Sequence, residues 1–161
     1  MDWRNKRVVV IDDEAPTRWL LALLFRERGA EVHLAGDGQR GLRMVGELRP
    51  DLIILDILMP GMNGWETLRL LRETTDVPVV VLTSTGTNED VARCLDAGAD
   101  DHVVKPFNKD VLMARCWAAV RRYPEPLRAQ APGDRRRAEG LRGTYRRNDR
   151  ELRGTLGTVG K

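Results

Sequence analysis

The chain has 161 residues, of which 42% are hydrophobic and 32% charged, a composition typical of a water-soluble globular protein of about one domain. No apolar run approaches the roughly 20 residues that a membrane helix needs, and no apolar signal segment opens the sequence, so we expect a cytoplasmic protein without a membrane partner. The two cysteines, Cys94 and Cys116, form no paired framework, which argues against a disulfide-rich secreted protein.

Charge is distributed unevenly along the chain. Residues 124–161 contain ten Lys/Arg and five Asp/Glu, a net of +5, whereas the whole chain carries +3, which leaves −2 for residues 1–123. The basic character therefore comes from the C-terminal stretch and does not indicate that the preceding part binds nucleic acid.

Apolar runs alternate with helical patterns through residue 122. The predicted strands cover residues 7–11, 31–34, 51–55, 77–82 and 101–104, and the predicted helices cover residues 16–28, 39–48, 64–73, 88–96 and 108–122, with Asn108 as an N-cap. Unbroken runs of branched residues such as Val8 to Ile11 are typical of strands covered on both faces. Short connections and right-handed crossovers then favour a doubly wound α/β fold, a (βα)5 parallel sheet in the order 2-1-3-4-5.

Four tryptophans accompany these elements. Trp19, Trp65 and Trp117 fall in predicted helices, and Trp3 precedes the first strand. We expect all four to pack in the core or at its edge rather than to stack on a ligand.

Polar side chains and one proline follow four of the predicted strands at the point where each strand ends. They are Asp12, Asp13, Asp56, Thr83, Ser84, Lys105 and Pro106. Because ligands of such sheets bind beyond the carboxyl ends of the strands, these residues are expected to gather there. Carboxylates brought together repel one another unless a cation holds them, and Mg²⁺ above all fits such an oxygen cluster. A lysine and a hydroxyl beside it suit an incoming phosphoryl group, so the pattern predicts an aspartate that becomes phosphorylated.

Two other classes of protein share parts of this pattern. A flavodoxin-like nucleotide or flavin protein needs a glycine- or hydroxyl-rich phosphate loop after the first strand, but residues 12–16 read DDEAP, which would repel phosphate without a metal. A metal-dependent phosphatase with an aspartyl nucleophile typically has a second aspartate two residues further on, where this chain has Leu58.

The periodic pattern ends near residue 123. Residues 124–161 are rich in Arg, Gly and small residues and cannot bury enough apolar surface to offset backbone ordering, so we expect a disordered linker or tail after a domain over residues 1–123. The tail has three readings: a linker to an output domain that is not evident in this chain, a basic arm in weak contact with nucleic acid, or an inert extension.

Five stretches resemble the motifs of response-regulator receiver domains, the CheY-like superfamily of two-component signalling. They are residues 9–14 (VVIDDE), 56–64 (DILMPGMNG), 82–84 (LTS), 97–101 (AGADD) and 105–107 (KPF). The resemblance covers residues 6–122. It implies a signalling switch rather than an enzyme with turnover, and a histidine kinase or a phosphotransfer protein as partner.

The resemblance also implies a role for each site residue. Asp56 is the phosphoacceptor. Mg²⁺ is held by Asp12, Asp13, Asp56 and the backbone carbonyl of Leu58. Lys105 and Thr83 contact the phosphoryl group on Asp56, and the small Ser84 leaves room for it. Lys105–Pro106 is a cis peptide bond. Output is expected through the face formed by the fourth helix, the fifth strand and the fifth helix.

Three features depart from the family pattern. His102 stands where many relatives have Tyr or Phe, so it is either the switch side chain or a surface histidine without such a role. Leu58 offers no hydrogen bond at a position that can orient the hydrolytic water, which favours a long-lived phosphoaspartate. Asp101 and Arg115 match charges through which relatives form homodimers, but Val111 replaces an expected acidic residue, so solvated surface charges are the alternative.

Overall fold

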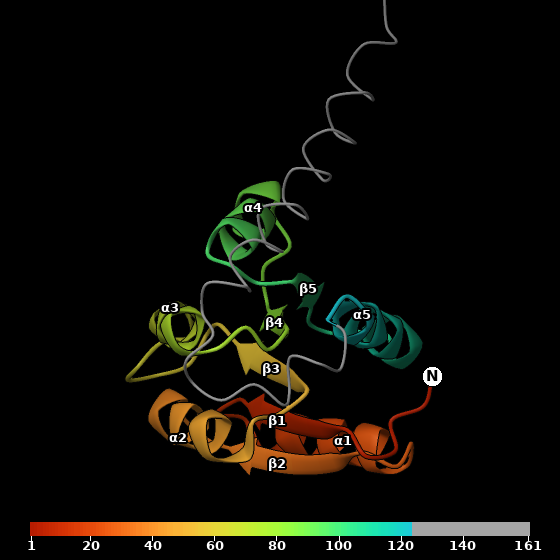
Figure 1. Cartoon of the computed structure of the whole chain (residues 1–161). Coiled ribbons are helices and arrows are strands. Elements are labelled where there is room, and N and C mark those ends of the chain that lie inside the picture. The colour runs from red at the N-terminus through yellow and green to blue at the C-terminus, as the bar shows by residue number, and fades with distance from the viewer. Residues whose placement is uncertain (124–161) are drawn as a thin grey trace, which may run out of the picture. The chain divides into compact units, whose positions relative to one another are not determined.

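The computed structural model describes residues 1–123, which form a five-stranded parallel sheet with helices on both faces (Figure 1). The strands are β1 (Arg7–Ile11), β2 (Glu31–Ala35), β3 (Leu52–Asp56), β4 (Val79–Thr83) and β5 (Asp101–Val104), and the helices are α1 (Ala15–Arg26), α2 (Gly38–Leu48), α3 (Gly64–Thr74), α4 (Asn88–Asp96) and α5 (Lys109–Arg121). The order β2-β1-β3-β4-β5, with every neighbouring pair parallel, confirms the predicted fold.

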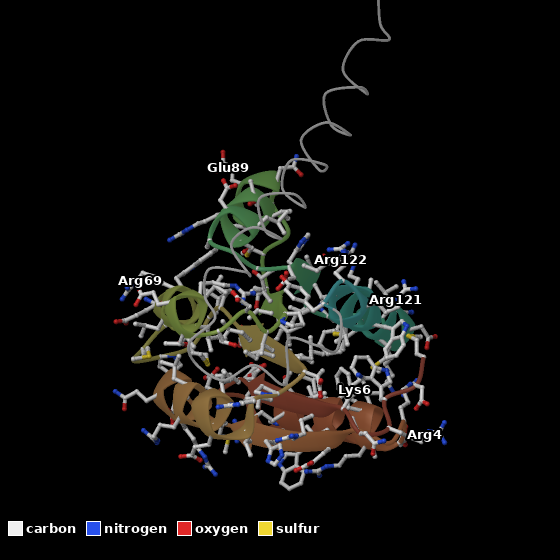
Figure 2. The ribbon with its side chains drawn as sticks, viewed as in Figure 1. Arg4, Lys6, Arg69, Glu89, Arg121 and Arg122 are labelled. Atoms are coloured by element: carbon white, nitrogen blue, oxygen red, sulfur yellow. The ribbon has the colours of Figure 1, made fainter. Side chains whose placement is uncertain are left out.

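Two apolar clusters lie on opposite faces of the sheet because successive strand residues point to opposite sides. Val8, Val10 and Ile54 pack with residues of α1 and α5 on one face. Ile11 and Leu55 pack with residues of α2, α3 and α4 on the other. Every residue of β3 and β4 is buried, as expected for central strands of a doubly covered sheet. Charged side chains such as Arg69 and Glu89 point outward (Figure 2).

The boundaries of two strands differ from the prediction in a way that matters for the site. Strands were expected over residues 51–55 and 77–82, but β3 ends at Asp56 and β4 at Thr83. The reason is register, because Asp56 lies opposite Leu82 and Thr83 lies opposite Val104. Both polar residues are therefore fixed by strand backbone rather than carried on a loop.

The N-caps of the helices show why the connecting loops turn where they do. The side chains of Asp37, Asn63, Thr87 and Asn108 each accept a hydrogen bond from a backbone N–H in the first turn of the following helix. The predicted cap at Asn108 is thus confirmed.

The expected packing is confirmed for Trp3, which is fully buried with its ring 4.8 Å from Phe25 and 5.3 Å from Trp117. It is wrong for Trp19, which is 65% exposed. The α1 helix buries Leu21 and Phe25 on its inner side, and Trp19 lies on the face that helical spacing leaves outside.

None of the helices between residues 1 and 123 is long and apolar enough to cross a membrane. The predicted disorder and roles of residues 124–161 lie outside the described residues.

Candidate functional site

Three carboxylates gather at the carboxyl ends of two neighbouring strands. Asp12 and Asp13 follow β1, and Asp56 ends β3. Each offers a carboxylate oxygen within 4.8 Å of those of the other two. Asp12 and Asp56 are buried, whereas Asp13 is exposed. The structure thus brings together the three acidic residues that the sequence predicts, in a group with the oxygen chemistry that suits a divalent cation.

Backbone groups hold these carboxylates in place. The Glu14 N–H donates to Asp12 Oδ1 at 2.8 Å, and the Leu58 N–H donates to Asp56 Oδ1 at 3.0 Å. On the other side of the loop, Arg18 Nη1 donates to the carbonyl oxygens of Asp12 and Asp13 at 2.7 and 2.8 Å. The loop after β1 is therefore fixed from both directions.

Lys105 places its ammonium group between the two buried carboxylates. Its Nζ donates to Asp12 Oδ2 and to Asp56 Oδ2, both at 3.0 Å, and to Glu14 Oε2 at 3.3 Å. The peptide bond between Lys105 and Pro106 is cis, as the family resemblance implies. One ammonium group thus faces the carboxylates of Asp12, Asp56 and Glu14, with Asp13 beside them, and the site keeps an excess of negative charge.

The charge states follow from burial and pairing. Burial raises the pKa of Asp12, and the hydrogen bond from Lys105 offsets this only in part. Burial alone would lower the pKa of Lys105, but its hydrogen bonds to Asp12 and Asp56 outweigh that effect and raise it. Lys105 therefore stays charged at neutral pH and is the partner that allows buried carboxylates to remain here.

The loop that follows Asp56 is closed by a tight contact at Gly64. A Cβ on Gly64 would lie 2.3 Å from Ile57 Cα and 2.4 Å from the Asp56 carbonyl oxygen, so only glycine fits. The first turn of α3 is consequently packed directly against the backbone of the candidate phosphoacceptor.

Thr83 lies at the end of β4, next to β3, and is buried. Its Oγ1 lies 3.1 Å from the Thr85 carbonyl oxygen and 3.1 Å from Thr85 Oγ1, and it accepts from the Thr85 N–H. Ser84 is exposed beside it. The hydroxyl of Thr83 therefore forms its hydrogen bonds with Thr85, in the loop that follows β4.

The sequence model of the response regulator receiver domain matches residues 8–116. The chain belongs to this family. It is 42% identical over 135 residues to the DNA-binding response regulator MtrA of Mycolicibacterium smegmatis, an alignment that covers 83% of this chain and 59% of MtrA. The chain therefore spans little more than half the length of that relative.

Solved structures of receiver domains have the same fold. The receiver domain of the Francisella response regulator 1452 is 30% identical, with a TM-score of 0.70 over 73% of this chain and 98% of the other. The BeF3-activated receiver domain of Klebsiella pneumoniae RstA is also 30% identical, with a TM-score of 0.68 over 71% of this chain and 98% of the other.

Leu58 and His102, which depart from the family pattern, lie beside the site and on β5, and the charged residues Asp101 and Arg115 lie on β5 and α5. Leu58 is 55% exposed just after Asp56. His102 lies on β5 with 19% of its side chain exposed, and within the described residues its Nδ1 has no hydrogen-bond partner. Arg115 Nη1 donates to Asp101 Oδ1 at 2.7 Å, so these two charges pair within one chain.

Two contributors to this receiver site were not predicted from the sequence. Glu14 lies in the acidic motif over residues 9–14 without a role assigned to it from the sequence, but its carboxylate contacts Lys105. Arg18, which holds the Asp12 and Asp13 carbonyls, carries no motif signal beyond its place four residues after Glu14 on α1.

Proposed function

We propose that this receiver domain is a signalling switch in which Asp56 accepts a phosphoryl group from a histidine kinase or a phosphotransfer protein. The observation that carries the proposal is the position of the Asp56 carboxylate, 3.0 Å from the Lys105 ammonium and grouped with Asp12 and Asp13. A carboxylate oxygen of Asp56 would bond to phosphorus as the bond between phosphorus and the imidazole nitrogen of the donor breaks.

The group of three carboxylates suits a magnesium ion, because their oxygens lie close together and only the ammonium of Lys105 offsets their negative charge. Asp12, Asp13, Asp56 and the backbone carbonyl of Leu58 would hold the ion. When bound, it would supply positive charge against the negative charge of the approaching phosphate. Lys105 would exchange its hydrogen bond to Asp56 for one to a phosphoryl oxygen.

The switch would begin at Thr83. Its hydroxyl would leave Thr85 and donate to the new phosphoryl group, drawing the β4–α4 loop toward Asp56, while the small Ser84 leaves room for the phosphate. Cys94 is the one α4 residue that is buried, fewer than in the neighbouring helices α3 and α5, so α4 would be the helix that shifts between two positions. Output would therefore pass through the face formed by α4, β5 and α5, with His102 as the side chain that responds on β5.

The similarity to MtrA, whose name states that it binds DNA, extends the proposal to the location of the domain and to its partners. The receiver would work in the cytoplasm and control an output domain beyond the described residues, and nucleic acid would be contacted by that output or weakly by residues 124–161. A homodimer through α4, β5 and α5 would require the Asp101–Arg115 pair to open and pair across two chains.

The test is intact-protein mass spectrometry after incubation with acetyl phosphate and Mg²⁺. We expect the wild type to gain the mass of one phosphoryl group, and we expect no gain in Asp56→Asn or when the metal is chelated. Asp96→Asn, which changes an exposed aspartate of α4, is the matched control and should be labelled like the wild type. An unlabelled wild type, or a labelled Asp56→Asn, would refute the proposal.

A further inference from the structure

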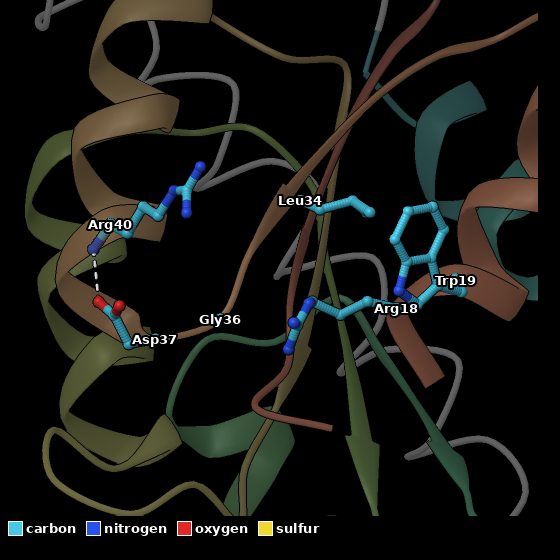
Figure 3. Close-up of a pocket in the computed structure, with 6 residues that line it drawn as sticks. All are labelled: Arg18, Trp19, Leu34, Gly36, Asp37 and Arg40. Atoms are coloured by element: carbon cyan, nitrogen blue, oxygen red, sulfur yellow. Dashed lines mark hydrogen bonds between the residues drawn. The ribbon is translucent and has the colours of Figure 1, made fainter. Parts of the chain in front are cut away.

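A cavity of about 340 Å³ opens on the side of the sheet edge formed by β2 (Figure 3). Arg18 and Trp19 of α1 line one wall, Asp37 and Arg40 at the start of α2 line the other, and Leu34 and Gly36 at the end of β2 lie between them. Its volume falls in the range of about 300–1,000 Å³ that is usual for small-molecule sites. None of the residues proposed to take part in phosphorylation lines it.

Two arginines and one aspartate line the cavity, so its lining carries a net positive charge. Figure 3 shows the side chains of Arg18 and Arg40 extending from α1 and α2 into the space between the two walls. Arg18 uses only Nη1, for the two backbone carbonyls of the acidic loop. The Arg40 guanidinium has no hydrogen-bond or ion-pair partner among residues 1–123. Two guanidinium forks in this arrangement suit a phosphate or a carboxylate.

The acidic residue of the cavity does not cancel this charge at Arg40. The Asp37 carboxylate accepts a hydrogen bond from the backbone N–H of Arg40 at 2.8 Å, drawn as the dashed line in Figure 3, and so serves as the N-cap of α2. Its negative charge is directed at the helix terminus, where it is stabilised.

The α1 wall also offers an apolar surface next to Arg18. Trp19 is 65% exposed, which is unusual for the largest apolar side chain, and Leu34 continues the surface toward the strand. An aromatic ring can stack on an indole, a contact that adds to the burial of apolar area. Charge at one end and an indole at the other define a ligand with an anionic group and a planar ring.

We propose that this cavity binds a small anion with a planar aromatic ring, its phosphate or carboxylate held by Arg18 and Arg40 and its ring stacked on Trp19. Binding would also affect the acidic site, because Arg18 fixes the carbonyls of Asp12 and Asp13. An anion that draws Arg18 away would loosen that loop and weaken Mg²⁺ binding, a consequence that rests on the proposed metal site.

Isothermal titration calorimetry without Mg²⁺ tests the site independently of phosphorylation. The probes are AMP and salicylate, which join a ring to a phosphate or a carboxylate, with adenosine and inorganic phosphate as controls that each lack one part. We expect AMP or salicylate to bind about tenfold more tightly than either control, the equivalent of about 1.4 kcal/mol. The AMP and salicylate arms distinguish the two sources of negative charge.

Variants then locate the site. Arg40→Gln and Trp19→Leu should each weaken the binding about tenfold, while Arg43→Gln, an exposed arginine of α2 outside the cavity, should leave it unchanged. Absence of binding by both anions overturns the proposal. Equal binding by wild type and Arg40→Gln overturns it as well. Failure of Mg²⁺ binding in a protein that still binds the anion would count against the metal site alone.

Discussion

The guanidinium of Arg93 on α4 lies over the ring of Trp65 on α3, with its central carbon 4.0 Å from the ring centroid. Trp65 follows Gly64, whose backbone packs against the Asp56 carbonyl. The contact therefore joins the helix that starts at the candidate phosphoacceptor to the helix of the proposed output face. It provides a physical link between the two that does not pass through Thr83.

The first prediction concerns the strength of this contact. Arg93→Gln and Trp65→Leu, made singly and together, should give a coupling free energy of about 0.5–1 kcal/mol in urea unfolding, the usual value of a partly exposed cation–π pair. Arg43→Gln combined with Trp65→Leu is the control and should show no coupling. A coupling energy of zero for the first pair would mean that the stacked geometry contributes nothing to stability.

The second prediction concerns repulsion inside the acidic group. The Asp13 carboxylate accepts no hydrogen bond from residues 1–123 and lies within 4.8 Å of two other carboxylates. Asp13→Asn should therefore raise the free energy of unfolding by about 1 kcal/mol at low salt without metal, because a like charge disappears. The same variant should lose the increase in Tm that Mg²⁺ gives the wild type, whereas Asp96→Asn should keep it. A destabilised Asp13→Asn protein would contradict the repulsion argument.

The fold and the acidic group were predictable because both depend on local sequence. Apolar runs fix the strands, the carboxyl ends of parallel strands lie at one edge of the sheet, Asp12 directly follows β1, and Asp56 is the last residue of β3. Helical spacing places Trp19 on the outer face of α1, but the general tendency of large rings to be buried predicts the opposite, and the structure agrees with the spacing. The Lys105–Glu14 contact and the Arg93–Trp65 stack depend on side-chain directions across elements distant in sequence, which no local pattern encodes.

The third prediction is a pH effect at the end of α5. The Tyr123 hydroxyl donates to Asp100 Oδ1 at 2.6 Å, and burial, followed by the charge of Asp100, raises the pKa of Tyr123 well above its ordinary value of 10.0. A raised pKa in the folded state means that the contribution to stability is complete below pH 10 and is lost as pH rises through the higher folded value. Tyr123→Phe should therefore be about 1–2 kcal/mol less stable at neutral pH and should lose less stability above pH 10.

The measurement for Tyr123 is the difference in tyrosinate absorbance between wild type and Tyr123→Phe during alkaline titration. The difference isolates Tyr123 from the other tyrosine of the chain, Tyr145. It should develop only above pH 10 and together with unfolding. A difference curve centred at pH 10 in folded protein would show that Asp100 and burial leave this phenol unaffected.

The fourth prediction uses the unpaired nitrogen of His102. Its Nδ1 is buried, has no hydrogen-bond partner among the described residues and lies 3.9 Å from Asp101 Oδ1. A cavity of about 190 Å³ beside it, bordered by Phe107 and Val111 among others, leaves room for a larger ring. His102→Phe should raise the free energy of unfolding by about 1 kcal/mol, because the unsatisfied group disappears.

The control for His102 is His33→Phe, since His33 is paired with Glu31 and should gain nothing. A separate measurement tests the switch. His102→Ala should alter the binding of a partner that recognises the phosphorylated domain, and unchanged binding would leave His102 with a packing role only.

The last prediction concerns the lifetime of the phosphorylated state and rests on Asp56 being the phosphoacceptor. Leu58 follows two residues later, is 55% exposed, and its backbone N–H is bonded to Asp56 Oδ1, so its side chain lies at the edge of the site with no polar atom to orient water. Leu58→Asn adds an amide there and should shorten the half-life roughly threefold to tenfold, a change of about 0.7–1.4 kcal/mol in the barrier. The decay is followed by intact mass after removal of acetyl phosphate, with Leu95→Asn, an exposed leucine of α4, as control. Equal half-lives in wild type and Leu58→Asn would show that this side chain does not govern hydrolysis.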